Sequence, residues 1–271
     1  MSQTKETAAE RVDALMEQAS RALVARQYFL TERLCLEALD VAHVAYDYAR
    51  MAAILLPLQE ARRFKRQMAL DTGHITVICA EMPGPHDLAA GCFLVCPPRV
   101  GLDGRQLREL CDRSEIPALI LTREPTNRAG LWPIVALGPA TIRATVTPPP
   151  VRKKKNGKPP KIVEGDVATI FMAAWTSEAA ASAPTVEWFV SAAEALGDAA
   201  IAQIDQARPP AVRVEELCMR LTAFPDHEKL HQRLHDACIE AARVGKPPPG
   251  KIRPEDVLDQ LDDEVDETSE V

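Results

Sequence analysis

The sequence predicts an α+β protein in which helical hairpins at both ends flank a small mixed α/β centre with a βαβ unit. Apolar residues recur at helical spacing near both ends, and short β-branched runs lie between them. Clusters of proline and glycine separate the two kinds of segment. We therefore divide the chain into a tetratricopeptide-like helical region 1–72, a small α/β domain 73–177, a C-terminal helical region 185–245 and an acidic tail 246–271.

The composition is that of a folded protein rich in aliphatic side chains. Of the 271 residues, 46% are apolar and only 4% are aromatic, which excludes wholesale disorder and assigns the core to Ala, Leu, Val and Ile. The net charge of -7 argues against a surface given over entirely to nucleic acid. The seven cysteines include no CxxC pair, and most lie in apolar runs, so we expect buried thiols in a reducing compartment.

Two further features indicate a cytoplasmic protein without a membrane partner. The segment 2–11 is polar and has none of the apolar character of a signal peptide. The longest apolar run, 51–58, is far shorter than the ~20 residues that span a bilayer.

Helices are expected from residue 8 to residue 70. The first apolar stripe breaks at Arg26-Gln27, which predicts a short turn before a second helix. The stretch 45–56 is apolar almost all round, which indicates burial on several sides. We expect Pro57 to open a further helix, because proline is tolerated in a first turn, and 71–73 to end the last one. The two stripes consist of Val12, Leu15, Ala19, Ala22 and Leu23, and of Leu30, Leu34, Ala38, Val41 and Ala42.

The centre is expected to consist of short strands and one helix. The order strand, helix, strand predicts a βαβ crossover and a partly parallel sheet. The basic segment 148–161 carries Asn156-Gly157, which suits a hairpin tip, and its lysines and prolines suit an exposed arm. The expected strands are 75–79, 92–96, 118–121, 132–137, 141–147 and 162–170, and the expected helix is 104–113.

The C-terminal region is predicted to be helical again. Thr185 is the expected N-cap of a helix over 186–207, on which Trp188 faces a partner. Pro209-Pro210 ends that helix, and two more follow, over 212–221 and from 225 to 244. The acidic tail is either a frayed end or a docking helix.

The N-terminal hairpin resembles a tetratricopeptide repeat. The matching residues are Tyr28, Ala38 and Leu39, in the order Gln27-Tyr28-x-x-Thr31-x-x-x-Cys35-x-x-Ala38-Leu39. In that family the aromatic residue and the alanine let two antiparallel helices pack closely. The motif is not repeated further along the chain, so the resemblance implies one capped hairpin pair and not a solenoid.

The centre resembles part of a response-regulator receiver domain. The matching segments are Phe93-Leu94-Val95-Cys96, Asp103-Gly104-x-x-Leu107 and 117–122, which together cover about thirty residues. Cys96 stands where that family has its phosphate-accepting aspartate, and Thr122 matches its switch hydroxyl. No lysine follows the strand 134–137, so the resemblance implies a fold fragment without phosphotransfer.

One short motif suggests a metal centre. His227-Glu228-Lys229-Leu230-His231 matches HExxH, in which two histidines one turn apart bind zinc and the glutamate is a general base. No third ligand is evident, and Pro225 places His227 in the first turn of its helix. We therefore expect a solvated helix face and no cofactor, and we keep a zinc-dependent hydrolase with ligands His227 and His231 as the alternative.

The basic arm and the cysteines offer weaker signals. Arg152, Lys153, Lys154 and Lys155 could contact nucleic-acid phosphates or pair with the acidic tail, but no aromatic residue lies among them for base stacking. A solvated hairpin tip explains them more simply. Cys96 ends its strand before a proline and is the cysteine that we would test for reactivity.

The expected function is protein–protein interaction or scaffolding, without catalytic residues. The sequence has no Gly-rich phosphate loop and no Gly-x-Ser-x-Gly elbow. The surfaces that we expect to bind a protein partner are the hairpin around Tyr28 and the helix that carries Trp188. A nucleic-acid accessory protein that uses the segment 152–161 is the second alternative, and self-association stays open.

Overall fold

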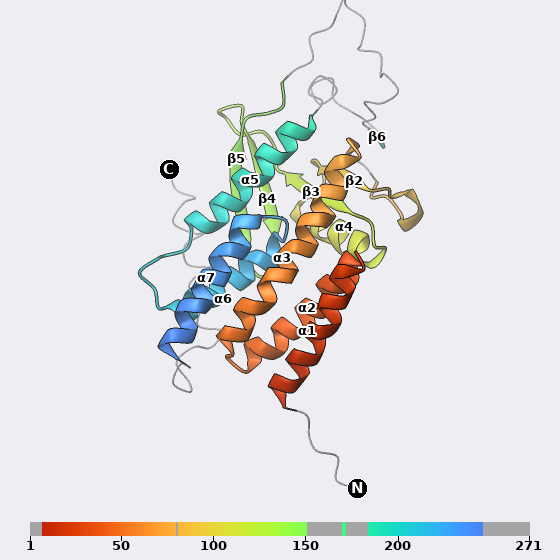
Figure 1. The fold of residues 1–271 in the computed structure, drawn as a ribbon. Helices are drawn as coiled ribbons and strands as arrows, with labels where there is room; N and C mark the ends of the chain where they lie inside the picture. The colour runs from red at the N-terminus through yellow and green to blue at the C-terminus, as the bar shows by residue number, and fades with distance from the viewer. Residues whose placement is uncertain (1–6, 80, 151–169, 172–183, 246–271) are drawn as a thin grey trace, which may run out of the picture. The chain divides into compact units, whose positions relative to one another are not determined.

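Seven α-helices and six strands make up the described part of the chain, residues 7–79, 81–150, 170–171 and 184–245, in the computed structural model (Figure 1). The fold is α+β, with helices at both ends and a central mixed sheet, as predicted. Most of the predicted basic arm, most of the strand 162–170 and the acidic tail 246–271 lie outside the described residues.

The pattern of spatial contacts between residues divides the chain into two compact units. The helical unit consists of residues 1–62 and 201–271, and the α/β unit consists of residues 63–200. The sequence separates the terminal helical regions 1–72 and 185–245, whereas this division groups most of both into one unit. Its boundaries fall inside the helices α3 (Tyr48–Asp71) and α5 (Val186–Ala202).

The helical unit begins with a tightly packed hairpin of α1 (Ala8–Val24) and α2 (Tyr28–Val44), which lie side by side (Figure 1). Thr7 caps α1 by accepting a hydrogen bond from the Glu10 N–H at 3.2 Å, which satisfies one of the free donors of the first turn. Both helices bury small side chains, which let helix backbones approach closely. The buried small residues of α1 and α2 include Ala19, Ala22, Cys35, Ala38 and Ala42.

The connections α1–α2 and α2–α3 have the same turn conformation. Arg26 and Tyr46 have φ values of 60° and 52°. In each turn the N–H of the following residue donates to a carbonyl of the preceding helix. Gln27 donates to Ala22 and Asp47 donates to Ala42, both at 2.9 Å. This is the left-handed C-terminal cap known as the Schellman motif. Both turns have the sequence Val-Ala-x-x-Tyr, at 24–28 and 44–48.

Pro57 lies inside α3 and does not open a new helix, so that prediction is wrong. An internal proline removes one backbone hydrogen bond and costs about 3 kcal/mol. Burial outweighs this cost, because each fully buried Leu or Ile contributes about 1.5–3 kcal/mol. The fully buried residues of α3 on both sides of the proline are Met51, Ile54, Leu55, Leu58 and Ala61.

Two more helices complete the described part of the helical unit. They are α6 (Pro210–Ala223) and α7 (Glu228–Val244), which pack against each other. Pro210 opens α6, where the missing N–H of proline does no harm. The prediction that Pro209-Pro210 ends the helix 186–207 is wrong, because α5 already ends at Ala202.

The α/β unit is built on a sheet of strand order β5-β4-β3-β2-β1-β6. The strands β6, β1, β2 and β3 run parallel, and β4 and β5 add antiparallel pairs. The helix α4 (Gly101–Arg113) joins β2 to β3, which confirms the predicted βαβ unit. The strands are β1 (Ile75–Ile78), β2 (Gly91–Val95), β3 (Ala118–Arg123), β4 (Trp132–Leu137), β5 (Thr141–Val146) and β6 (Ile170–Phe171).

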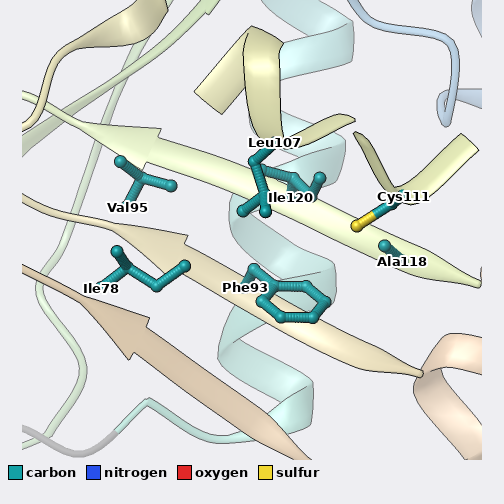
Figure 2. Close-up of a cluster of buried hydrophobic side chains, with 7 residues drawn as sticks. All are labelled: Ile78, Phe93, Val95, Leu107, Cys111, Ala118 and Ile120. Atoms are coloured by element: carbon teal, nitrogen blue, oxygen red, sulfur yellow. The ribbon is translucent and has the colours of Figure 1, made fainter. Parts of the chain in front are cut away.

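One face of the sheet packs against α4 (Figure 2). At the centre of this contact, Gly104 of α4 lies against Thr122 of β3, and a Cβ atom at Gly104 would come within 2.0 Å of the threonine Oγ1. The helix therefore sits as close to the strand as glycine allows. The cluster on this face consists of Ile78, Phe93, Val95, Leu107, Cys111, Ala118 and Ile120.

Side chains alternate across each strand, so the residues next to this cluster along a strand point to the opposite face of the sheet.

Thr185 caps the helix α5, which begins at Val186. Its hydroxyl accepts a hydrogen bond from the Trp188 N–H at 3.2 Å, as the N-cap prediction requires.

Among the described residues, none of the helices combines the length and the apolar character needed to cross a membrane.

Candidate functional site

The histidines of the HEKLH segment are buried, so the predicted solvated face is wrong for both of them. His227 and His231 are each 1% exposed. His231 belongs to the apolar stripe of α7, next to Leu230 and Leu234, because positions i, i+1 and i+4 share one wide helix face. A buried polar ring is tolerated where hydrogen-bond partners exist, and for His231 these are Arg62 and the backbone carbonyl of His227.

Arg62 of α3 links His231 to Glu32 of α2. The Arg62 Nε donates to the Glu32 carboxylate at 2.6 Å, and a second guanidinium nitrogen lies 3.2 Å from His231 Nε2. His231 Nδ1 lies 3.0 Å from the backbone carbonyl of His227. A carbonyl only accepts and a guanidinium only donates, so Nδ1 carries the proton and Nε2 accepts.

This environment keeps His231 uncharged. Burial, followed by the charge of Arg62, lowers the pKa of His231 to about 3. The imidazole is therefore neutral at neutral pH, and it ties α7 to the Glu32–Arg62 ion pair.

The hydrogen bonds of His231 occupy both ring nitrogens that a zinc ion could bind. A zinc ligand needs a free lone pair on one ring nitrogen, but in His231 one nitrogen carries a proton and the other accepts from Arg62. Glu228, the would-be base, is exposed and accepts a hydrogen bond from Gln59 at 3.1 Å. Within the ranges that the structure describes, no three His, Cys, Asp or Glu side chains are grouped to hold a metal ion.

A second, partly buried pair joins α2 to α6. His43 Nε2 lies 2.8 Å from both carboxylate oxygens of Glu215. The hydrogen bond to Glu215 raises the pKa of His43, because it stabilises the protonated ring. Polar groups in the helical unit thus bond across helices to one another.

Of the residues predicted to bind a partner, two are half-buried and the others lie outside the described residues. Trp188 of α5 is half-buried, and its ring stacks edge-to-face on Trp132 at 5.7 Å and on Phe189 at 5.8 Å. Its indole N–H donates to the carbonyl of Thr147 at 2.8 Å. Trp188 therefore takes part in the packing of the α/β unit. Tyr28 is half-buried at the start of α2, and Arg152, Lys153, Lys154 and Lys155 lie outside the described residues.

A pair of thiols at the carboxyl edge of the parallel strands was not predicted as a site. Cys79 follows β1 and Cys96 follows β2, and the Cys96 thiol donates to the Leu94 carbonyl at 3.8 Å. Arg123 ends β3 and hydrogen-bonds to Cys96, while its guanidinium covers the Trp132 ring at 4.3 Å. Cys79, followed by burial, raises the pKa of Cys96, and Arg123 opposes this rise.

The sequence held a signal for this pair. Each cysteine directly follows an apolar strand, and the carboxyl ends of neighbouring parallel strands meet at one edge of a sheet, where α/β proteins commonly bind ligands. Only the strand order, which places β1 beside β2, was missing.

No protein-family model matches the chain, and neither does any curated protein or solved structure. The resemblances to a tetratricopeptide repeat and to a receiver fragment therefore rest on the residues quoted for them, and function has to be argued from geometry.

Proposed function

We propose that the protein is a non-catalytic scaffold that binds another protein through the exposed faces of its helical unit. The observation that carries this proposal is the cross-linked succession α1, α2, α3. Asp13 of α1 pairs with Arg50 of α3 at 3.1 Å, and Glu32 of α2 pairs with Arg62 of α3 at 2.6 Å. A third pair, Arg11 of α1 with Glu37 of α2 at 2.6 Å, joins the first two helices. Each helix is thereby held against the two others, as in a stack of helices that offers its outer faces to partners.

The interior polar groups support this reading. Glu32, Arg62 and His231 form one network, and His43 and Glu215 form another, so these groups stabilise the packing of helices. Buried networks of this kind fix how helices pack, since breaking one leaves a buried charge uncompensated.

The surface that we propose for binding is the α2–α3 face, defined as Leu36, Leu56 and the half-buried Tyr28. Leu36 is 37% exposed and Leu56 is 58% exposed. The short connection 45–47 and the Glu32–Arg62 pair set an antiparallel register in which Leu36 lies level with about residue 58 of α3. The two exposed leucines therefore lie at a similar height along α2 and α3, and a partner that contacts both needs apolar contact residues.

We also propose a cytoplasmic location and a function that needs no cofactor. The seven cysteines are all free thiols, which supports a reducing compartment.

The test compares binding by the wild type and by the double variant Leu36→Glu, Leu56→Glu. A matched control, Val24→Glu with Val244→Glu, adds the same charge at two exposed helix ends. A protein captured from native extract is identified, purified and titrated against all three chains, whose helicity is checked by circular dichroism. We expect Kd to rise at least tenfold, which is about 1.4 kcal/mol, for the leucine variant only.

Other results would favour other functions. Equal binding by all three chains refutes the α2–α3 face, and concentration-dependent sedimentation that only the leucine variant loses makes the partner a second copy. Stoichiometric zinc that His231→Ala removes would favour the hydrolase. Salt-sensitive retention of nucleic acid, abolished by neutralising 153–155, would favour the accessory protein.

A further inference from the structure

We propose that Cys79 and Cys96 are a redox-active pair that forms a reversible disulfide by exchange with a low-molecular-weight disulfide such as oxidised glutathione, with Cys79 as the attacking thiol. This inference concerns the α/β unit alone, and it stands or falls independently of the scaffold function.

The backbone places the two cysteines side by side. In the parallel pair β1–β2, Ile78 is in register with Val95, and the Cys96 N–H donates to the Ile78 carbonyl at 2.8 Å. Cys79 and Cys96 are the next residues along both strands, so their side chains share the face opposite Ile78 and Val95. Neighbouring strands lie about 4.8 Å apart, which falls within the ~4.4–6.8 Å that a disulfide requires between Cα atoms. The effect of Cys79 on the pKa of Cys96 agrees with this placement.

The two thiols differ in access. Cys79 is half-buried and lies just beyond the end of β1, whereas Cys96 is only 3% exposed. A dissolved disulfide therefore meets Cys79 first. Cys96 lies behind it, in the position of a resolving thiol.

The exchange balances in two steps. The Cys79 thiolate attacks one sulfur of oxidised glutathione, so the S–S bond breaks, one glutathione leaves as its thiolate, and a mixed disulfide forms on Cys79. Cys96 then gives its proton to solvent and attacks the Cys79 sulfur, which expels the second glutathione as its thiolate. The protein loses two electrons, and the small disulfide gains them.

Formation of the mixed disulfide on Cys79 favours ionisation of Cys96 in the second step. Cys79 is the largest cause of the raised pKa of Cys96, through its hydrogen bond and its charge. A mixed disulfide on Cys79 carries no negative charge on that sulfur, so both of these effects are removed. The Arg123 guanidinium stays beside Cys96 and favours its thiolate.

Two other cysteines serve as controls. Cys92 is also buried on β2, but it lies four residues before Cys96, which is about 13 Å along a strand. Cys111 belongs to the cluster under α4, on the opposite face of the sheet (Figure 2). Neither can replace one member of the pair without moving the backbone.

The experiment treats the reduced full-length protein with oxidised glutathione under native conditions, blocks the remaining thiols by alkylation, and maps peptides by mass spectrometry. We expect one internal cross-link between Cys79 and Cys96, which dithiothreitol reverses. Cys92→Ala and Cys111→Ala should keep it. In Cys96→Ser the glutathione adduct should accumulate on Cys79, and in Cys79→Ser the other thiol should stay unmodified.

Arg123 provides a rate test in the same assay. Arg123→Gln should slow the conversion of mixed to internal disulfide roughly threefold, because the Cys96 thiolate loses the positive charge beside it, and its greater nucleophilicity offsets only part of this loss. Arg123→Lys should be closer to the wild type. The proposal is overturned if the native protein gives no such cross-link, or if Cys96 reacts equally well in Cys79→Ser.

Discussion

Acid should destabilise the helical unit through one neutral histidine. The pKa of His231 is about 3 in the folded protein, against a value of 6.5 for the free side chain. Because the folded value is depressed, protons bind the unfolded chain first as the pH falls below 6.5, and the folded state loses stability until the pH approaches 3.

The size of this effect follows from the two values. Between about pH 7.5 and pH 5 the unfolded histidine becomes almost fully protonated while the folded one stays neutral, which costs about 2 kcal/mol. His43 acts in the opposite direction. Its pKa is raised by Glu215, so its contribution is fully present below the unfolded pKa and is lost as the pH rises through the folded value.

The two histidines are separated by comparing variants. Urea unfolding of the wild type and of His231→Gln at about pH 7.5 and pH 5 gives the change in unfolding free energy with pH for each. The variant keeps His43, so we expect the wild type to lose about 2 kcal/mol more than the variant on acidification. His235→Gln, on the partly exposed side of the same helix, should behave like the wild type. Equal pH dependence in the wild type and His231→Gln would refute the neutral, buried imidazole.

Three further predictions concern packing. Arg62→Met removes the guanidinium that neutralises the buried Glu32 carboxylate and should lower the unfolding free energy by about 3–5 kcal/mol. Adding Glu32→Gln should restore part of this loss, and a double variant no more stable than the single one would contradict the prediction. Gly104→Ala should cost about 1–3 kcal/mol in urea unfolding, and Thr122→Ala should relieve most of that loss, so strictly additive effects would count against the close contact. Thr185→Ala removes the N-cap of α5 and should cost about 1 kcal/mol, seen as a lower Tm, whereas an unchanged Tm would show that the cap is not needed.

Periodicity was sufficient to predict most of the elements, because local patterns reflect which face of an element is buried. The stripe that begins at Val12 predicts α1, and its four residues up to Ala22 are buried. The runs before Cys79 and after Gly91 predict β1 and β2, and the helix between β2 and β3 predicts their parallel pairing. The prediction for Pro57 failed because a rule about local backbone energy was applied where tertiary burial is larger.

A repeated signal at the helix ends was overlooked. The sequence Val-Ala-x-x-Tyr occurs at 24–28 and again at 44–48, and each copy ends a helix with a residue at positive φ. Neither Arg26 nor Tyr46 is a glycine, so glycine or proline punctuation marks neither turn. The first turn was predicted only from the break in the apolar stripe at Arg26-Gln27.

The HEKLH segment shows where sequence reasoning reaches its limit. The spacing of His227 and His231 is the same in a zinc site and in a structural helix, so the motif alone cannot distinguish them. What distinguishes them is Arg62, far away in the chain, whose guanidinium donates to the nitrogen that a metal would need. Removing that guanidinium frees the nitrogen, so Arg62→Met should bind zinc more readily than the wild type if the arginine is what excludes the ion. If both proteins bind zinc equally, the exclusion must have another cause, such as the burial of the two histidines themselves.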